Sequence, residues 1–141
     1  MPRIKIELPK HWSFRTSLPV RVTDINYGNH MGNDAFLGLL HEARMQWLGQ
    51  FGWTELISER TGLIMVEIEV RLKSQARYGD VLKISMSPVN FGRMGFHLVY
   101  LAENSATGTE VARARTGMVF FDYSANKLAA MPEGFRDRVE C

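Results

Sequence analysis

Apolar and polar residues alternate through much of the second half of the chain, the pattern of β-strands with one face in water. The alternation is cleanest over residues 66–73, which predict a long strand. Shorter alternating stretches predict three further strands over 82–87, 96–102 and 110–122. Polar and glycine-containing turns separate them at 78–80, 90–93 and 104–108. Such short turns favour antiparallel hairpins between consecutive strands.

Residues 34–51 change to a helical period. Their apolar positions form one broad stripe that is suited to burial: Phe36, Leu39, Leu40, Ala43, Trp47 and Phe51. Gly52 is placed to end this helix. Before the helix, alternation over 18–22 predicts a first strand, in which Pro19 favours an edge or a bulge.

The element order of strand, helix and several strands predicts an α+β fold. One helix and four or five antiparallel strands bury their apolar sides together only if the sheet curls around the helix. The length of 141 residues suits a single domain over 1–141. We expect its core to span about 13–123 and the tail, 124–141, to be irregular or a short helix.

Composition narrows the class of protein. With 45% hydrophobic and 23% charged residues the chain is typical of soluble globular proteins. A net charge of +2 is too weak for a dedicated nucleic-acid binder but suits an anionic small molecule. No apolar run is long enough for a secretion signal or a membrane span, and Cys141 is the only cysteine. We therefore expect a cytoplasmic protein without a membrane segment.

Candidate chemistry concentrates in the loop at 24–33, which reads DINYGNHMGN and leads directly into the helix. Three of its residues adopt positive φ at little cost: Gly28, Asn29 and Gly32. Side-chain donors and acceptors come from four others: Asp24, Asn26, His30 and Asn33. Of these, Asn33 is expected to cap the helix N-terminus. A loop this polar and this constrained is typical of a binding or catalytic site.

The combination of a strand, the loop D-x-N-x-x-N-H-x-x-N, a helix containing Glu42-Ala43-Arg44 and a meander of long strands resembles the hot-dog fold thioesterases. This is the family of 4-hydroxybenzoyl-CoA thioesterase and the acyl-ACP thioesterases, and the resemblance spans about residues 13–123. It implies a helix wrapped by a curved antiparallel sheet of about five strands. It also implies a homodimer or dimer of dimers with sites between subunits. The implied activity is hydrolysis of an acyl-CoA or acyl carrier protein thioester.

The resemblance places the catalytic acid of the loop in two ways. Counted from Asn33, the acid of the 4-hydroxybenzoyl-CoA type falls on Asp24. Counted back from Glu42-Ala43-Arg44, it falls on Asn26, which can orient water but cannot act as a base. The Asn-x-His pair of the acyl-ACP thioesterases is also altered, because Gly28 stands two residues before His30 and the amide is Asn29.

Thioester hydrolysis needs an activated water or a carboxylate nucleophile, and N–H donors for the developing oxyanion. Asp24 or Glu42 supplies the carboxylate in this hypothesis, and His30 is the base or its orienting partner. Backbone N–H groups near His30 and Met31 are the expected oxyanion donors. The residues expected to contact substrate are Asn26, Asn29, Met31 and Asn33. Each of these residues also has a purely structural interpretation, as a turn former, a cap or a solvated side chain.

The hydrolysis described requires no cofactor or metal. His41-Glu42 begins like the zinc-binding motif H-E-x-x-H, but Met45 stands where the second histidine belongs, so the motif is incomplete. Basic residues on neighbouring strands are weaker candidates for CoA phosphate contacts: Arg71, Lys73 and Arg77. Two alternative functions stay open. One is binding of acyl-CoA or acyl carrier protein without turnover, and the other is a hydratase or dehydratase on the same fold.

Overall fold

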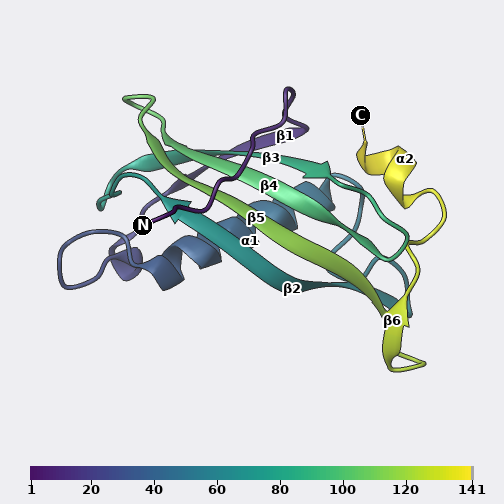
Figure 1. Ribbon diagram of the computed structural model, residues 1–141. Coiled ribbons are helices and arrows are strands. Elements are labelled where there is room, and N and C mark those ends of the chain that lie inside the picture. Colours follow the sequence, from purple (N-terminus) through teal and green to yellow (C-terminus); the bar gives the residue numbers. More distant parts are fainter. Residues whose placement is uncertain (141) are drawn as a thin grey trace.

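The computed structural model, which describes residues 1–140, places one long helix inside a curved antiparallel sheet (Figure 1). The elements in chain order are β1 (Phe14–Pro19), the 3-10 turn η1 (Val22–Asp24), α1 (Asn33–Gly49), β2 (Thr61–Leu72), β3 (Val81–Val89), β4 (Gly95–Asn104), β5 (Glu110–Asp122), β6 (Lys127–Ala129) and α2 (Phe135–Val139). The strand order is β1-β3-β4-β5-β2, with β6 paired to β5. This arrangement confirms the predicted α+β class and the wrapped helix.

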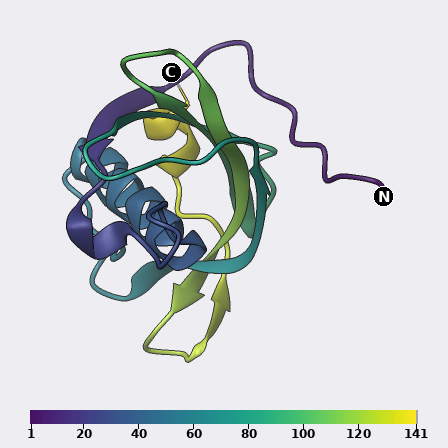
Figure 2. The ribbon, with the colours of Figure 1, turned by 90° about the vertical axis from the view of Figure 1, so that its left-hand side faces the viewer.

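The end-on view shows α1 on the concave side of the curved sheet (Figure 2). Buried residues of the helix and of the strands form the core between them. The predicted apolar stripe of the helix is buried from Phe36 to Trp47, and Leu48 extends it. The helix ends at Gly49, and Gly52 takes a φ of 79° shortly after it. This left-handed residue turns the chain away, as the sequence predicted.

The first strand lies earlier than predicted, over Phe14–Pro19 instead of 18–22. Its residues pair in register with β3, from Phe14 opposite Met86 to Pro19 opposite Val81. After Pro19 the carboxylate of Asp24 accepts the backbone N–H of Arg21 and draws the chain into η1. The strand is at the edge of the sheet and Pro19 is its last residue, as expected for a proline.

The strand predicted over 66–73 is longer, spanning Thr61–Leu72, and a bulge between Met65 and Glu67 shifts its register. It forms the other edge of the sheet, and within residues 1–140 its outer side is paired only at its beginning, where Leu63 donates to the carbonyl of Glu55 and Ile57 donates to that of Thr61. The expectation of one buried apolar face is therefore only partly correct. Ile68 and Val70 are half-buried, while Val66 and Leu72 are 58% and 54% exposed.

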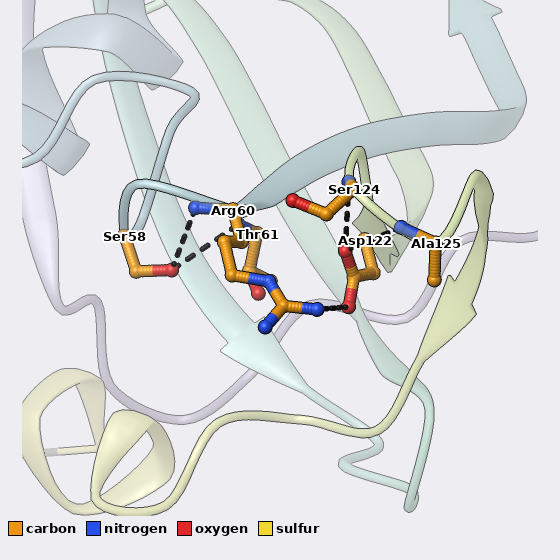
Figure 3. Close-up of polar contacts among 6 residues, drawn as sticks. All are labelled: Ser58, Arg60, Thr61, Asp122, Ser124 and Ala125. Carbon is orange, nitrogen blue, oxygen red and sulfur yellow. Dashed lines mark hydrogen bonds and ion pairs between the residues drawn. The ribbon is translucent and has the colours of Figure 1, made fainter.

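Asp122 joins the beginning of β2 to the end of β5 (Figure 3). One carboxylate oxygen accepts the backbone N–H groups of Ser124 and Ala125, at 2.8 and 3.0 Å. The other accepts Nη2 of Arg60 at 3.1 Å. The N–H of Ala125 is the largest influence that holds the pKa of Asp122 below its ordinary value, and Ser124 and Arg60 add to it. The carboxylate therefore fixes the turn into β6.

The two chain ends pack onto the domain in ways that the sequence did not indicate. Ile6 is buried, its carbonyl accepts Nη1 of Arg113, and the carbonyl of His11 accepts the Ser87 hydroxyl, so the N-terminal segment crosses the outer face of the sheet. The tail forms β6 as well as the short helix α2. In α2, Phe135 is buried against Trp53 and Phe120.

Candidate active site

A cleft of about 470 Å³ opens at the N-terminal end of α1. One wall is the loop of residues 26–33 and the opposite wall is the segment 72–76 that leaves β2. Five residues predicted for the site line it: Asn26, His30, Met31, Asn33 and Lys73. The other five predicted site residues lie outside its lining: Asp24, Asn29, Glu42, Arg71 and Arg77.

Hydrogen bonds to Asn26 close the loop on itself. Its side-chain oxygen accepts the N–H of Gly28 at 3.0 Å, and its own N–H donates to the carbonyl of His30 at 2.8 Å. Asn29 adopts a φ of 63°, the left-handed conformation expected of it. Gly28 and Gly32 do not adopt positive φ, which corrects that part of the prediction. Of the three residues expected to adopt positive φ, only Asn29 does so in the described loop.

The N–H groups expected to stabilise an oxyanion are already hydrogen-bonded. That of Met31 donates to the carbonyl of Ala76 at 2.7 Å, and that of Gly32 donates to the carbonyl of Asp24 at 2.9 Å. The N–H of His30 faces the side-chain oxygen of Asn26 at 3.4 Å. The expectation for His30 and Met31 is corrected on this point, because the bond of Met31 holds the loop against the opposite wall and that of His30 is made within the loop.

The free donors lie one turn later, at the start of α1. Gly32, not Asn33, is the N-cap, and no side chain caps the helix. The predicted cap role of Asn33 is therefore wrong, because the carbonyl of Gly32 already accepts the N–H of Phe36. The N–H groups of Asn33, Asp34 and Ala35 have no hydrogen-bond partner within residues 1–140. Together with the helix dipole they favour an anion or oxyanion at this point.

His30 is half-buried at the edge of the cleft. Its ring nitrogens make no hydrogen bond with other residues in the range 1–140. An imidazole that is accessible in a cleft and not tied to a carboxylate is able to accept a proton from water.

Asp24 is buried, with 6% of its surface exposed, and faces Arg21 instead of the cleft. Its carboxylate accepts the N–H of Arg21 at 2.8 Å and two guanidinium bonds at 3.2 Å. Burial works to raise the pKa of Asp24, but the hydrogen bonds and charge of Arg21 outweigh it, so the pKa lies below its ordinary value. The geometry is that of an ionised carboxylate that closes a turn.

Glu42 lies exposed in the middle of α1, where it accepts Nε2 of Gln46 at 2.9 Å. Its charge, after that of Asp24, contributes to raising the pKa of Arg21. The two predicted carboxylates therefore lie near the same guanidinium, whereas His30 lies in the cleft. Within one chain the structure does not bring the three predicted catalytic residues together.

Of the three cations considered for CoA phosphates, Lys73 alone lines the cleft. Its Nζ lies 3.4 Å from Oε2 of Glu110, which also accepts Nε of Arg113. Arg71 is the cross-strand neighbour of Arg113 on β5. The backbone N–H of Arg77 donates to Asp80 and so belongs to the turn before β3.

An apolar groove continues from the cleft along the edge between α1 and β2. It has a volume of about 300 Å³ and shares Asn33, Phe36 and Leu72 with the cleft. Beyond them its lining is Leu37, Ile68 and Val70. Cleft and groove together form one path from the free N–H groups of α1 to the half-buried face of β2.

Two contributors to this region escaped the sequence reasoning. Arg21 holds Asp24 in place, and the spacing of three residues between them is the signal that indicates a capping box at a turn. Ala76 accepts the N–H of Met31 through its carbonyl, and no side-chain pattern marks such a backbone contact. The order of polar and apolar residues in 73–77 likewise did not indicate that this segment forms a wall of the cleft.

Some classes of site are missing from the part of the chain that the structure describes. Within residues 1–140, no group of three or more His, Cys, Asp or Glu side chains is arranged to hold a metal ion. Over the same residues, no helix has the length and hydropathy needed to cross a lipid bilayer. Cys141, discussed above as the only cysteine, lies outside the described residues.

Several solved structures share this fold. The 1,4-dihydroxy-2-naphthoyl-CoA thioesterase of Synechocystis has a TM-score of 0.81 at 22% identity, covering 89% of this chain and 94% of that chain. A probable thioesterase of Escherichia coli has a TM-score of 0.79 at 23% identity, covering 92% of this chain and 97% of that chain. A hypothetical protein of Staphylococcus aureus in complex with CoA has a TM-score of 0.81 at 18% identity, covering 96% of this chain and 85% of that chain.

No curated protein matches the chain by sequence. The model of the thioesterase-like superfamily, however, matches residues 20–139, which include the loop, α1 and all strands except β1. The fold and this match agree, and the chain belongs to the thioesterase-like superfamily of hot-dog proteins.

Proposed function

We propose that the protein hydrolyses the thioester of an acyl-CoA, or of an acyl carrier protein, in the cleft at the start of α1. The observation that carries the proposal is that the unpaired imidazole of His30 lines the same cleft as Asn33, the first residue of α1, whose backbone N–H group is also unpaired within residues 1–140. Membership of the thioesterase-like superfamily supports it. So does the likeness in fold to a protein whose structure holds CoA.

In the proposed reaction the thioester carbonyl oxygen lies at the N-terminus of α1, near the N–H groups of Asn33 and Asp34. A ring nitrogen of His30 accepts a proton from water as the water oxygen bonds to the carbonyl carbon. The free N–H groups stabilise the tetrahedral oxyanion. When that intermediate collapses, the C–S bond breaks and the imidazolium returns its proton to the thiolate, which releases the free acid and the thiol of the carrier.

The two carboxylates take different parts in this proposal. Asp24 is a positioning residue, because Arg21 occupies both of its oxygens and its backbone carbonyl holds Gly32 at the start of α1. Glu42 is exposed and has a single hydrogen bond, so it is available to a site on a second chain. We propose that Glu42 of one protomer assists the cleft of the other, as the family resemblance implies.

A homodimer through β2 is part of the proposal. Both edge strands have a free side, which in β2 begins after the bridge between Gly62 and Leu56. However, β1 is six residues long and ends in a proline, whereas β2 is twelve residues long and contains none. Long, unprotected edges with exposed apolar residues favour pairing with another chain. Met65, Val66 and Leu72 are exposed along this edge. Pairing of β2 with a second copy covers them and closes the apolar groove from outside.

For the carrier, Lys73 is the cation best placed to meet a phosphate of CoA, since it lies at the rim of the cleft with Glu110 as its partner. Arg71 and Arg77 lie outside the lining and are secondary candidates. A cytoplasmic location, expected from the composition of the chain, is also part of the proposal.

Release of free thiol from a panel of short, long and aromatic acyl-CoAs tests the activity directly. We expect release with at least one acyl class, and a fall in kcat of about 10²-fold or more for His30→Ala, the usual contribution of a general base. Glu42→Gln is expected to lower kcat, while Asp24→Asn acts mainly through stability. The exposed acid Glu59, changed to Gln, is the matched control and keeps the wild-type rate.

Two results would point to the alternative functions. Tight binding of CoA thioesters without thiol release indicates a binding protein, in which Asn26 replaces a loop acid and its amide only closes the turn. A change in absorbance with an enoyl-CoA, without thiol release, indicates a hydratase or dehydratase. Full hydrolysis by His30→Ala and Glu42→Gln together would contradict the assignment of residues but not the activity.

A further inference from the structure

Arg44 places a guanidinium in the interior without a carboxylate partner. The residue is 6% exposed, and its one hydrogen bond runs from Nη1 to the hydroxyl of Tyr100 at 3.1 Å. Nε is buried and has no partner, and no acid pairs with this arginine within residues 1–140. A buried charge left in this state is strongly unfavourable unless another group completes it.

Two buried hydroxyls accompany the guanidinium. The hydroxyl of Tyr100 lies 2.9 Å from Oγ1 of Thr116, and both residues are almost fully inaccessible to solvent. Burial is the largest influence on Tyr100 and raises its pKa, so its hydroxyl stays neutral and able to donate. We call these three residues, Arg44, Tyr100 and Thr116, the arginine cluster. It combines one fixed positive charge with two hydroxyl groups.

The register of the sheet places the arginine cluster next to the inner end of the apolar groove, although its three residues are not among those that line the groove. Thr116 on β5 is directly opposite Ile68 on β2, and directly opposed residues share a face of the sheet. Of the β2 residues that line the groove, Ile68 is the farthest along the strand from Leu72, which the groove shares with the cleft. On α1, Leu37 lines the groove, and Arg44 follows seven residues later on the same helical face. Helix and sheet thus independently lead from the groove to the cluster.

The dimensions suit an acyl chain of medium length. From Leu72, which the cleft and groove share, to Ile68 is four residues of extended strand, or roughly 13 Å. The walls over this distance are apolar: Phe36, Leu37, Ile68 and Val70. A purely aliphatic acyl group fills such a path but leaves the charge of Arg44 uncompensated. An acyl group that ends in a carboxylate fills the same path and neutralises the charge.

We propose that the arginine cluster binds a carboxylate at the far end of the acyl group, so that the preferred substrates are CoA monothioesters of medium-length dicarboxylic acids. The guanidinium forms charge-assisted hydrogen bonds to the carboxylate through its free N–H groups, and whichever hydroxyl of the Tyr100–Thr116 pair accepts from the other donates its own proton to the carboxylate. This inference rests on the proposed thioesterase function, since it assigns the thioester to the opposite end of the path.

The kinetic test compares suberoyl-CoA with octanoyl-CoA, which differ only in the terminal carboxylate. We expect kcat/KM at least ten-fold higher for suberoyl-CoA. Thr116→Val and Tyr100→Phe preserve the side-chain shape, and each is expected to reduce this ratio several-fold, while Arg44→Gln brings it to one or below. Arg60→Gln removes an exposed guanidinium at the opposite end of β2 and is expected to leave the ratio unchanged. Circular dichroism verifies that each variant is folded.

A binding measurement separates this inference from the proposed activity. The probes are two S-alkyl thioethers of CoA with the same chain length, one ending in a carboxylate and one in a methyl group. By titration calorimetry we expect the carboxylate-ended thioether to bind at least ten-fold more tightly to the wild type, and this preference to disappear in Tyr100→Phe or Arg44→Gln.

The outcomes are distinct. If no thioester is hydrolysed but the binding preference is present, the proposed activity fails and the assignment of the ligand stands. If the methyl-ended thioether binds as tightly as its partner, the inference is overturned. The same holds if the preference survives in both folded Tyr100→Phe and folded Arg44→Gln, because the carboxylate then binds elsewhere.

Discussion

At the scale of single residues, Asp24 shows how a predicted catalytic acid acquires a structural task. The pKa of its carboxyl in the folded chain lies below the ordinary value, so its stabilising effect is full above about pH 4 and is lost as the pH falls through the folded-state value. We expect Asp24→Asn to lower the free energy of unfolding by about 1–2 kcal/mol at pH 7. The difference from wild type should shrink at pH 3. Urea denaturation at both values measures it, and an equal loss at both would contradict the ion-pair account.

Asn29 tests the turn of the site loop, because its backbone has a φ of 63°. Asn29→Gly is expected to be close to neutral, since glycine adopts this conformation without strain. Asn29→Ala should cost about 1–2 kcal/mol from the left-handed backbone. Thermal unfolding of the pair measures the difference. Equal stability of the two variants would show that the loop changes its conformation freely.

At the scale of elements, the tail helix α2 completes the aromatic core although it has only five residues. Phe135 is buried against Phe96, Phe120 and Trp53. We expect Phe135→Ala to cost about 3–5 kcal/mol, the usual cost of deleting a buried aromatic ring. Glu133→Ala, an exposed change two residues earlier, should stay within about 0.5 kcal/mol. A small effect of Phe135→Ala in chemical denaturation would mean that α2 docks only weakly.

At the scale of the whole molecule, the proposed dimer depends on the edge of β2. The double variant Met65→Lys/Val66→Lys adds two charges to this edge and should shift the protein to a monomer in light scattering. Val22→Lys/Leu128→Lys adds the same charges at exposed positions away from β2 and should leave the dimer intact. A monomeric wild type, or a double β2 variant that dimerises as well as the wild type does, would contradict pairing through this edge.

Sharing of the site between protomers has its own test. If His30 and Glu42 act across the dimer, mixing His30→Ala with Glu42→Gln regenerates intact sites in the mixed dimers, about a quarter of all sites after random exchange. We therefore expect activity to return when the two inactive variants are unfolded and refolded together. Activity that stays at the level of the separate variants would place both residues in the site of one chain.

The amino-acid sequence by itself determined the α+β class, the buried stripe of α1, the long strands and the loop that carries His30. These features depend on local periodicity and turn chemistry, which are properties of neighbouring residues. The sequence also indicated Asn29 as a left-handed residue and Pro19 as an edge residue, for the same local reason.

Only the tertiary structure decided which groups are free. Met31 donates its N–H to the carbonyl of Ala76, and Arg44 lies beneath β4 and β5 with no acidic partner among residues 1–140. Arg44 and its hydrogen-bond partner Tyr100 are 56 positions apart along the chain, and no local pattern encodes such pairings. A hydrogen bond or an unpaired charge is defined by everything that surrounds it, and that environment exists only once the sheet has closed around the helix.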